Sequence, residues 1–154
     1  MVIDIHTHTF PDKLAAPTIR KLQGACHTRA FTDATNAGLA ASMARAGIDC
    51  SVVLPVATNP HQVAHVNESA AQINARGRGT GIYSFGCIHP DCPDPRGELA
   101  RIAALGLKGI KLHPAYQATR FDDIRYLRIL DRAGELASMA RAGIDCSVVL
   151  PVAT

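Results

Sequence analysis

The sequence predicts an α/β fold of parallel βα repeats, and two observations carry this prediction. Short apolar runs rich in β-branched residues alternate along the chain with longer segments of helical periodicity. The helical segments are long enough to return the chain to the start of the next strand, so we expect parallel strands joined by right-handed crossovers. The length of 154 residues and the 47% of hydrophobic residues fit a single globular domain with a buried core.

The expected strands are short apolar runs at residues 2–6, 50–56, 81–88 and 107–112. The expected helices lie within residues 12–22, 35–46, 60–75, 95–105 and 122–136. Asn59 and Asp94 are expected N-caps, each followed by a proline, while Gly47 and Gly106 follow a last helical turn. In the last helix, one face is expected to lie on the sheet: Ile124, Leu127, Leu130 and Ala133.

An internal repeat covers the end of the sequence, where residues 137–154 copy residues 41–58 letter for letter. Structural repeats usually keep their apolar pattern while exposed residues drift, whereas this match is complete at both kinds of position. We interpret the copy as a recombination or assembly scar that replaces the continuation after about Glu135; a recent tandem duplication is the alternative. The domain organisation is therefore an N-terminal part of a domain over residues 1–136, followed by the copy, which offers residues 147–152 as a fifth strand.

Repeats of this kind fit either an open sheet or the first part of a (β/α)8 barrel. A complete barrel takes about 250 residues and at least about 200, so the expected barrel is incomplete, with about four to five strands. In both architectures, ligands bind at the carboxyl ends of the strands. Candidate site residues are therefore sought where the expected strands end.

The sharpest local motif is His6-Thr7-His8, at the end of the first expected strand. Residues i and i+2 of a strand point to the same face, so both imidazoles can reach one metal ion. Asp4 shares this face, while Ile3 and Ile5 are expected to pack against helices on the other. The alternative is a pair of ordinary histidines in a polar turn.

A second strand ends on a histidine at Lys111-Leu112-His113-Pro114, with Lys111 and His113 on the inner face. Three histidines from two strand ends can bind one divalent ion, and a catalytic zinc ion prefers three protein ligands with an open position for water. Taken without His6 and His8, His113 would be better interpreted as a structural histidine at a strand end.

The segments IDIHTHTFPDKLA and GLKGIKLHPAYQ resemble the amidohydrolase-related (amidohydrolase 2) family of the metal-dependent amidohydrolase superfamily, which includes aminocarboxymuconate-semialdehyde decarboxylase-like proteins. The resemblance covers about residues 1–135, the N-terminal part only. It implies a (β/α)8 TIM barrel in which His6 and His8 bind a divalent metal, usually zinc, and His113 completes the histidine ligation. It also implies a later catalytic histidine and a late aspartate, which would lie beyond this chain.

The expected function is that of a metal-dependent hydrolase, in which metal-activated water attacks a carbonyl-type carbon of a small molecule, or of a lyase that decarboxylates a small carboxylic acid. One alternative is a catalytically inactive, truncated fragment. Another is a metal-dependent phosphoesterase of the polymerase-and-histidinol-phosphatase type, which also opens with an HxH strand. Those sequences usually continue with Ser-Asp-Gly, whereas this chain continues Phe10-Pro11-Asp12-Lys13.

Further histidines receive weaker assignments. His89 ends the third expected strand and is a candidate substrate-binding residue. His61 and His65 have the spacing of zincin ligands, but Gln62 stands where a zincin needs its catalytic glutamate, so a surface pair is expected.

Charge and hydropathy limit the expected partners to a small-molecule substrate and further copies of the chain. The formal net charge is +3 and the basic residues are scattered, so nucleic acid is not an expected partner. The sequence has no signal peptide and no apolar stretch of membrane-spanning length, so a cytoplasmic protein without membrane contact is expected. Homo-oligomers or aggregates are expected because an unclosed sheet leaves unpaired edges.

Overall fold

The computed structural model describes residues 1–27 and 29–141, which divide into two compact units. The first unit comprises Met1–Val53 and Arg76–Tyr83, and the second comprises Leu54–Ala75 and Ser84–Thr154. Strands and helices alternate along the chain and the strands pair in parallel, so the predicted α/β class is confirmed.

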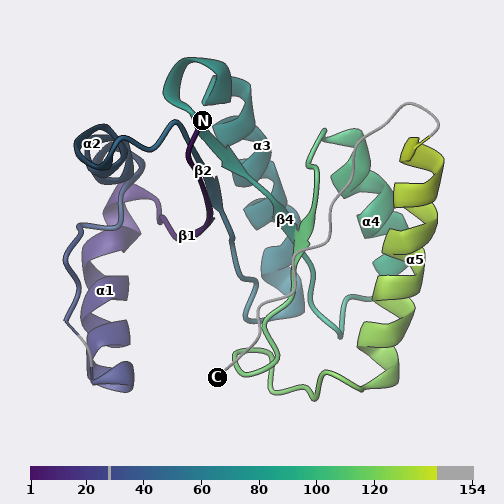
Figure 1. Cartoon of the computed structure of the whole chain (residues 1–154). Coiled ribbons are helices and arrows are strands. Elements are labelled where there is room, and N and C mark those ends of the chain that lie inside the picture. The colour runs from purple at the N-terminus through teal and green to yellow at the C-terminus, as the bar shows by residue number, and fades with distance from the viewer. Residues whose placement is uncertain (28, 142–154) are drawn as a thin grey trace. The chain divides into compact units, whose positions relative to one another are not determined.

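The first unit is built around a three-stranded sheet with the order β1-β2-β3. Its strands are β1 (Ile3–Thr7), β2 (Cys50–Val53) and β3 (Ile82–Ser84), and its helices are α1 (Asp12–Cys26) and α2 (Asn36–Ala46). Figure 1 shows β1 and β2 side by side, and they run parallel with Ile3 opposite Cys50. The side chain of Thr35 caps α2 by accepting the N–H of Gly38 at 2.9 Å, and Gly47 ends the helix in the left-handed conformation, as predicted.

The predicted packing of Ile3 and Ile5 against helices is wrong. Their side chains are 50% and 59% exposed. The pairing of β1 with β2 shifts between Asp4 and Thr7, where β1 contains one residue more than β2. The irregularity begins only after Asp4, so Ile3 and Ile5 keep the common face that alternation predicts, but that face is exposed instead of covered by helices.

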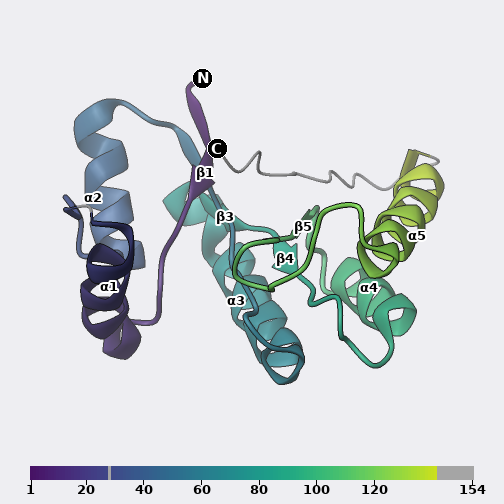
Figure 2. The same cartoon turned by 90° about the horizontal axis from the view of Figure 1, so that it is seen from below.

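The second unit contains a two-stranded parallel sheet and the helices beside it (Figure 2). Its strands are β4 (Gly86–Cys87) and β5 (Ile110–Lys111), with Cys87 opposite Lys111. Its other elements are η1 (Pro60–Gln62), α3 (Val63–Thr80, which continues into the first unit), α4 (Pro95–Ala104) and α5 (Ile124–Arg141). Asp94 caps α4 as predicted, by accepting the N–H of Gly97 at 2.9 Å. Asn59 occupies the N-cap of η1 without a side-chain hydrogen bond.

The strand predicted at residues 81–88 is divided at Phe85 into β3 and β4. Two asparagines of α3 bind the backbone of this segment. Asn74 accepts the N–H of Ser84 at 2.6 Å and donates to its carbonyl at 3.0 Å, while Asn67 does the same for Cys87 at 2.8 and 3.0 Å. Because side-chain amides satisfy these backbone groups, the segment does not need an unbroken ladder with neighbouring strands.

The core of the second unit is formed by buried apolar residues of α3, β5, α4 and α5 and of the segments beside the strands. They are Ala70, Ile88, Leu99, Ile102, Leu107, Ile110, Leu112, Tyr126, Ile129 and Ala133. The buried face of α5 therefore differs from the predicted one: Ala133 and the half-buried Leu130 belong to it, but Ile124 and Leu127 are 56% and 47% exposed. The helix is rotated relative to the prediction because Tyr126 is fully buried, with its hydroxyl hydrogen-bonded inside the unit.

The copied segment begins inside α5, whose backbone is helical through Arg141. The predicted fifth strand at residues 147–152 lies outside the described residues. Among the helices that the structure describes, none is long and apolar enough to cross a membrane.

Candidate functional site

The two predicted metal-binding histidines near the N-terminus lie together in the first unit. His6 is the last residue but one of β1, His8 follows the strand, and both side chains are exposed. Their ring centroids are 5.1 Å apart, with an angle of 69° between the ring planes. The side chain of Asp4 turns back to the strand, where it accepts the N–H of His6 at 3.0 Å.

This spacing fits a shared metal ion. A ring nitrogen binds zinc at about 2.0–2.1 Å, which places the ring centroid about 3.2 Å from the ion, so two rings at a tetrahedral angle have centroids about 5 Å apart. The observed separation of 5.1 Å matches this value. The spacing of the two rings is thus compatible with two nitrogen ligands on one ion, and it is also that of an edge-to-face ring contact.

His113 lies in the second unit, two residues after the end of β5, and is half-buried. Its ring stacks on Tyr116, with 4.0 Å between centroids and 4° between planes, and its Nδ1 accepts the backbone N–H of Tyr116 at 3.3 Å. A neutral imidazole that accepts at Nδ1 carries its proton on Nε2. To bind a metal through Nδ1, His113 would have to exchange the Tyr116 hydrogen bond for the ion. To bind through Nε2, the neutral ring would have to carry its proton on Nδ1, which also removes the acceptor of that bond.

The structure thus describes the surroundings of each of the three predicted metal ligands, but it does not place the three relative to one another. His6 and His8 belong to one unit and His113 to the other, so their convergence stays a prediction. Within each unit, no group of three histidine, cysteine, aspartate or glutamate residues among the described ones could hold a metal ion.

His89, the predicted substrate-binding residue, is buried at the end of the segment that contains β4, with 5% of its surface exposed. Its Nδ1 accepts the N–H of Asp91 at 3.1 Å. Burial lowers the pKa of the imidazole; the nearby Asp91 carboxylate opposes this effect and the Arg125 guanidinium adds to it. His89 is therefore neutral at physiological pH. Its contact with a substrate stays a prediction.

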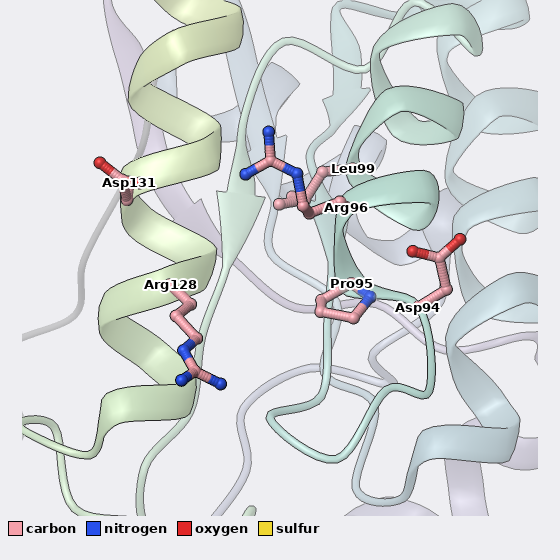
Figure 3. Close-up of a pocket in the computed structure, with 6 residues that line it drawn as sticks. All are labelled: Asp94, Pro95, Arg96, Leu99, Arg128 and Asp131. Atoms are coloured by element: carbon pink, nitrogen blue, oxygen red, sulfur yellow. The ribbon is translucent and has the colours of Figure 1, made fainter.

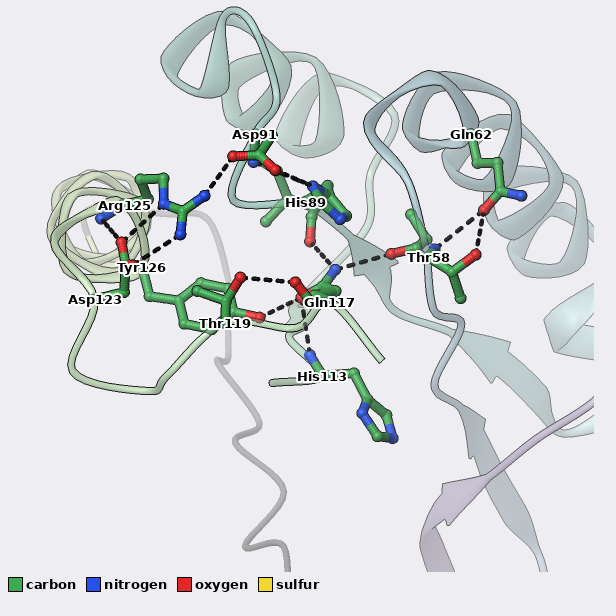
Figure 4. A network of polar contacts seen from close by, with 12 residues as sticks. Thr58, Gln62, His89, Asp91, His113, Gln117, Thr119, Asp123, Arg125 and Tyr126 are labelled. Atoms are coloured by element: carbon green, nitrogen blue, oxygen red, sulfur yellow. Dashed lines mark hydrogen bonds and ion pairs between the residues drawn. The ribbon is translucent and has the colours of Figure 1, made fainter. Parts of the chain in front are cut away.

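Sequence reasoning missed Gln117, whose buried side chain links three chain segments (Figure 4). Its amide nitrogen donates to the carbonyls of Ala57 and Ile88 at 2.9 and 2.8 Å. Its amide oxygen accepts the N–H of His113 at 3.2 Å and the hydroxyl of Tyr126. The segments that follow β2, β4 and β5 are thus joined by one residue, close to two of the predicted site histidines.

Two further titratable groups, Lys111 and Cys87, are buried near these strand ends. Lys111 is 2% exposed, and burial lowers the pKa of its ammonium group. Cys87 is fully buried, and burial raises the pKa of its thiol to about 12, so it is protonated and unreactive at neutral pH. The surface positions predicted for His61 and His65 are confirmed, since both are exposed.

A pocket of about 390 Å³ lies elsewhere in the second unit, beside the start of α4 and the middle of α5 (Figure 3). It is lined by charged residues of both signs together with Pro95 and Leu99: Asp94, Arg96, Arg128 and Asp131. None of the predicted site residues contributes to this pocket.

Comparison with solved structures supports the fold. A probable 2-pyrone-4,6-dicarboxylic acid hydrolase from Acinetobacter baumannii, solved with citric acid bound, superposes with a TM-score of 0.50 at 15% sequence identity. The match covers 97% of this chain and 57% of the hydrolase, so the chain spans little more than half the length of this neighbour. No family model matches the sequence. No curated protein matches it either.

These observations define the class of fold, a partial TIM-barrel-like α/β domain. The neighbour named above is described as a probable hydrolase.

Proposed function

We propose that the chain is the N-terminal part of a metal-dependent hydrolase of the amidohydrolase superfamily. The observation that carries this proposal is the His6 and His8 pair at the end of β1, with the ring spacing that a shared ion requires. The likeness to a barrel hydrolase supports it at the level of the fold.

In this proposal His6 and His8 hold the cation and His113 is the third ligand. Zinc is the favoured ion, because it binds imidazole nitrogen well and takes three protein ligands in catalytic sites. When bound, a divalent ion supplies a Lewis acid that polarises a carbonyl group and makes water more acidic. Asp4, through its hydrogen bond to the backbone of His6, holds the end of β1 in place for the pair.

His89 is proposed to contact the substrate from the end of the segment that contains β4. Because burial keeps its ring neutral, it would serve as a hydrogen-bonding group and not as a cation. The substrate class is a small molecule with a carbonyl-type carbon. Hydrolysis is the main proposal, and decarboxylation of a small carboxylic acid uses the same polarising group.

The proposal is tested by hydrolysis assays on the full chain with a panel of small lactones, esters and amides. Carboxylate-bearing lactones come first, since the structural neighbour is described as a hydrolase of a pyrone dicarboxylic acid. We expect activity that a chelator removes and zinc restores, that is lost in His6→Ala, and that persists in the surface variant His61→Ala. Metal-independent turnover, or full activity in His6→Ala, would contradict the proposal. A zinc-loaded chain without turnover would favour the alternative of a catalytically inactive fragment, because the family resemblance implies a later catalytic histidine and aspartate.

A further inference from the structure

The side-chain amide of Gln117 uses its full hydrogen-bonding capacity inside the second unit. Both N–H groups donate to backbone carbonyls, of Ala57 and Ile88, and the oxygen accepts from His113 N–H and from the Tyr126 hydroxyl. The residue is only 5% exposed. A buried amide with every position filled has one low-energy orientation, because turning it would leave several buried groups without partners.

Gln117 also holds the backbone of His113 from both sides. Its oxygen accepts the N–H of His113 at 3.2 Å, and its own backbone N–H donates to the carbonyl of His113 at 3.0 Å. Between these two bonds, the N–H of Tyr116 reaches Nδ1 of the His113 ring. The ring is therefore fixed by a turn that Gln117 closes and anchors to two neighbouring segments.

We propose that Gln117 is a positioning residue that sets the orientation of the His113 imidazole. With the turn held, Tyr116 N–H donates to Nδ1, so a neutral ring carries its proton on Nε2. The relevance to catalysis rests on the proposed function, in which His113 is the third ligand and would exchange this hydrogen bond for the ion. Control of the ring by Gln117 does not itself require a metal ion.

If Gln117 served only to join Ala57 and Ile88, another buried donor could replace it. Its side-chain oxygen also accepts the N–H of His113, beside the backbone bond from Gln117 N–H to the His113 carbonyl. The His113 ring and amide are therefore measured directly, because a change in global stability would not distinguish a structural role from a positioning role.

The test uses the full chain without added metal, at neutral pH, in the variant Gln117→Glu. This change keeps the size and the accepting oxygen but removes both donors to Ala57 and Ile88. Long-range ¹H–¹⁵N spectra report which ring nitrogen of His113 carries the proton, and amide exchange reports how firmly the turn is held. We expect the two ring signals to shift toward the average of both tautomers, and the His113 amide to exchange faster by about tenfold or more.

Gln62→Glu is the matched control, because Gln62 binds Thr58 through its oxygen, which a glutamate keeps. The control is expected to leave both readouts unchanged. A folded Gln117→Glu protein with the wild-type tautomer and exchange rate at His113 would overturn the proposal.

If Gln117→Glu does not fold, Tyr126→Phe decides the question. It removes one of the four hydrogen bonds of the amide and retains the aromatic ring in the core. We expect the same direction of change at His113, smaller in size, whereas unchanged His113 signals would overturn the proposal. Failure of the proposed function is seen separately, as metal-independent turnover or full activity in His6→Ala.

Discussion

Histidines at the ends of the second unit's strands are held through their Nδ1 atoms. His89 accepts the N–H of Asp91, and His113 accepts the N–H of Tyr116. Each is followed by a proline, which has no N–H of its own. At His89 the next amide, that of Asp91, reaches back to the ring, and at His113 the amide of Tyr116, two residues after Pro114, does so. Both rings are thereby oriented by the local backbone, as a residue of a binding site needs to be.

Burial of His89 makes stability depend on pH. Its folded-state pKa lies below the ordinary value near 6.5, so the unfolded chain binds more protons over that range. The stabilisation is present above about pH 6.5 and is lost as the pH falls through the folded-state pKa. We predict that His89→Asn, which keeps an acceptor for Asp91 N–H but does not titrate, loses less stability between pH 7.5 and 5 than the wild type does. Thermal unfolding across this pH range checks the prediction, and parallel curves for the two proteins would contradict it.

The sequence could predict those site residues whose signal is local. The spacing of His6 and His8, and the positions of His89 and His113 after apolar runs, are visible in a few consecutive letters. Gln117 was not predictable, because its role depends on which loops meet in space: Ala57 and Ile88 are far from it in the sequence. The only local hint is its place four residues after His113, in a turn.

At the scale of single elements, α3 shows how a helix can organise a strand through side chains. Asn67 and Asn74 lie two helical turns apart on one face, and each binds both backbone polar groups of one residue in the neighbouring segment. The same interaction explains why the strand predicted at residues 81–88 is divided. An amphipathic pattern does not reveal it, since Asn67 is polar and yet fully buried.

We predict that Asn67→Leu destabilises the fold by about 2–4 kcal/mol, because it leaves the buried N–H and carbonyl of Cys87 without partners, at about 1–3 kcal/mol each. Gln72→Ala, at an exposed position of the same helix, should change the free energy of unfolding by less than about 0.5 kcal/mol. Urea denaturation measures both. Equal effects of the two substitutions would show that the asparagine contacts do not matter to the fold.

At the scale of the whole molecule, the predicted parallel α/β order is observed, because alternation of strand-like and helix-like segments restricts the topology strongly. The bulge in β1 and the buried face of α5 were not predictable from periodicity, since one follows from strand pairing and the other from the hydrogen bond of a buried tyrosine. The division into residues 1–136 and a copied segment stays a prediction.

Association of the chain with itself follows from its exposed apolar strand residues. Val2, Ile3 and Ile5 in and beside β1 are all at least half exposed, and β1 is an edge strand of the described three-stranded sheet. Open edges of this kind pair with other chains unless they are covered. We predict a mass above that of the 16.3 kDa monomer in light scattering at micromolar concentration, reduced toward the monomer by Ile5→Lys. A clean monomer for the unmodified chain would contradict this prediction.

Calorimetric titration of the metal-free chain with zinc shows whether the HxH motif holds a metal ion. We expect one zinc ion per chain and a loss of affinity of at least about a hundredfold in His6→Ala/His8→Ala, since even outer ligand partners contribute about 10- to 100-fold. The surface variant His61→Ala/His65→Ala should bind as the wild type does, and the cysteines are the same in all three proteins. Equal zinc affinity in the His6→Ala/His8→Ala protein and the wild type would contradict the account.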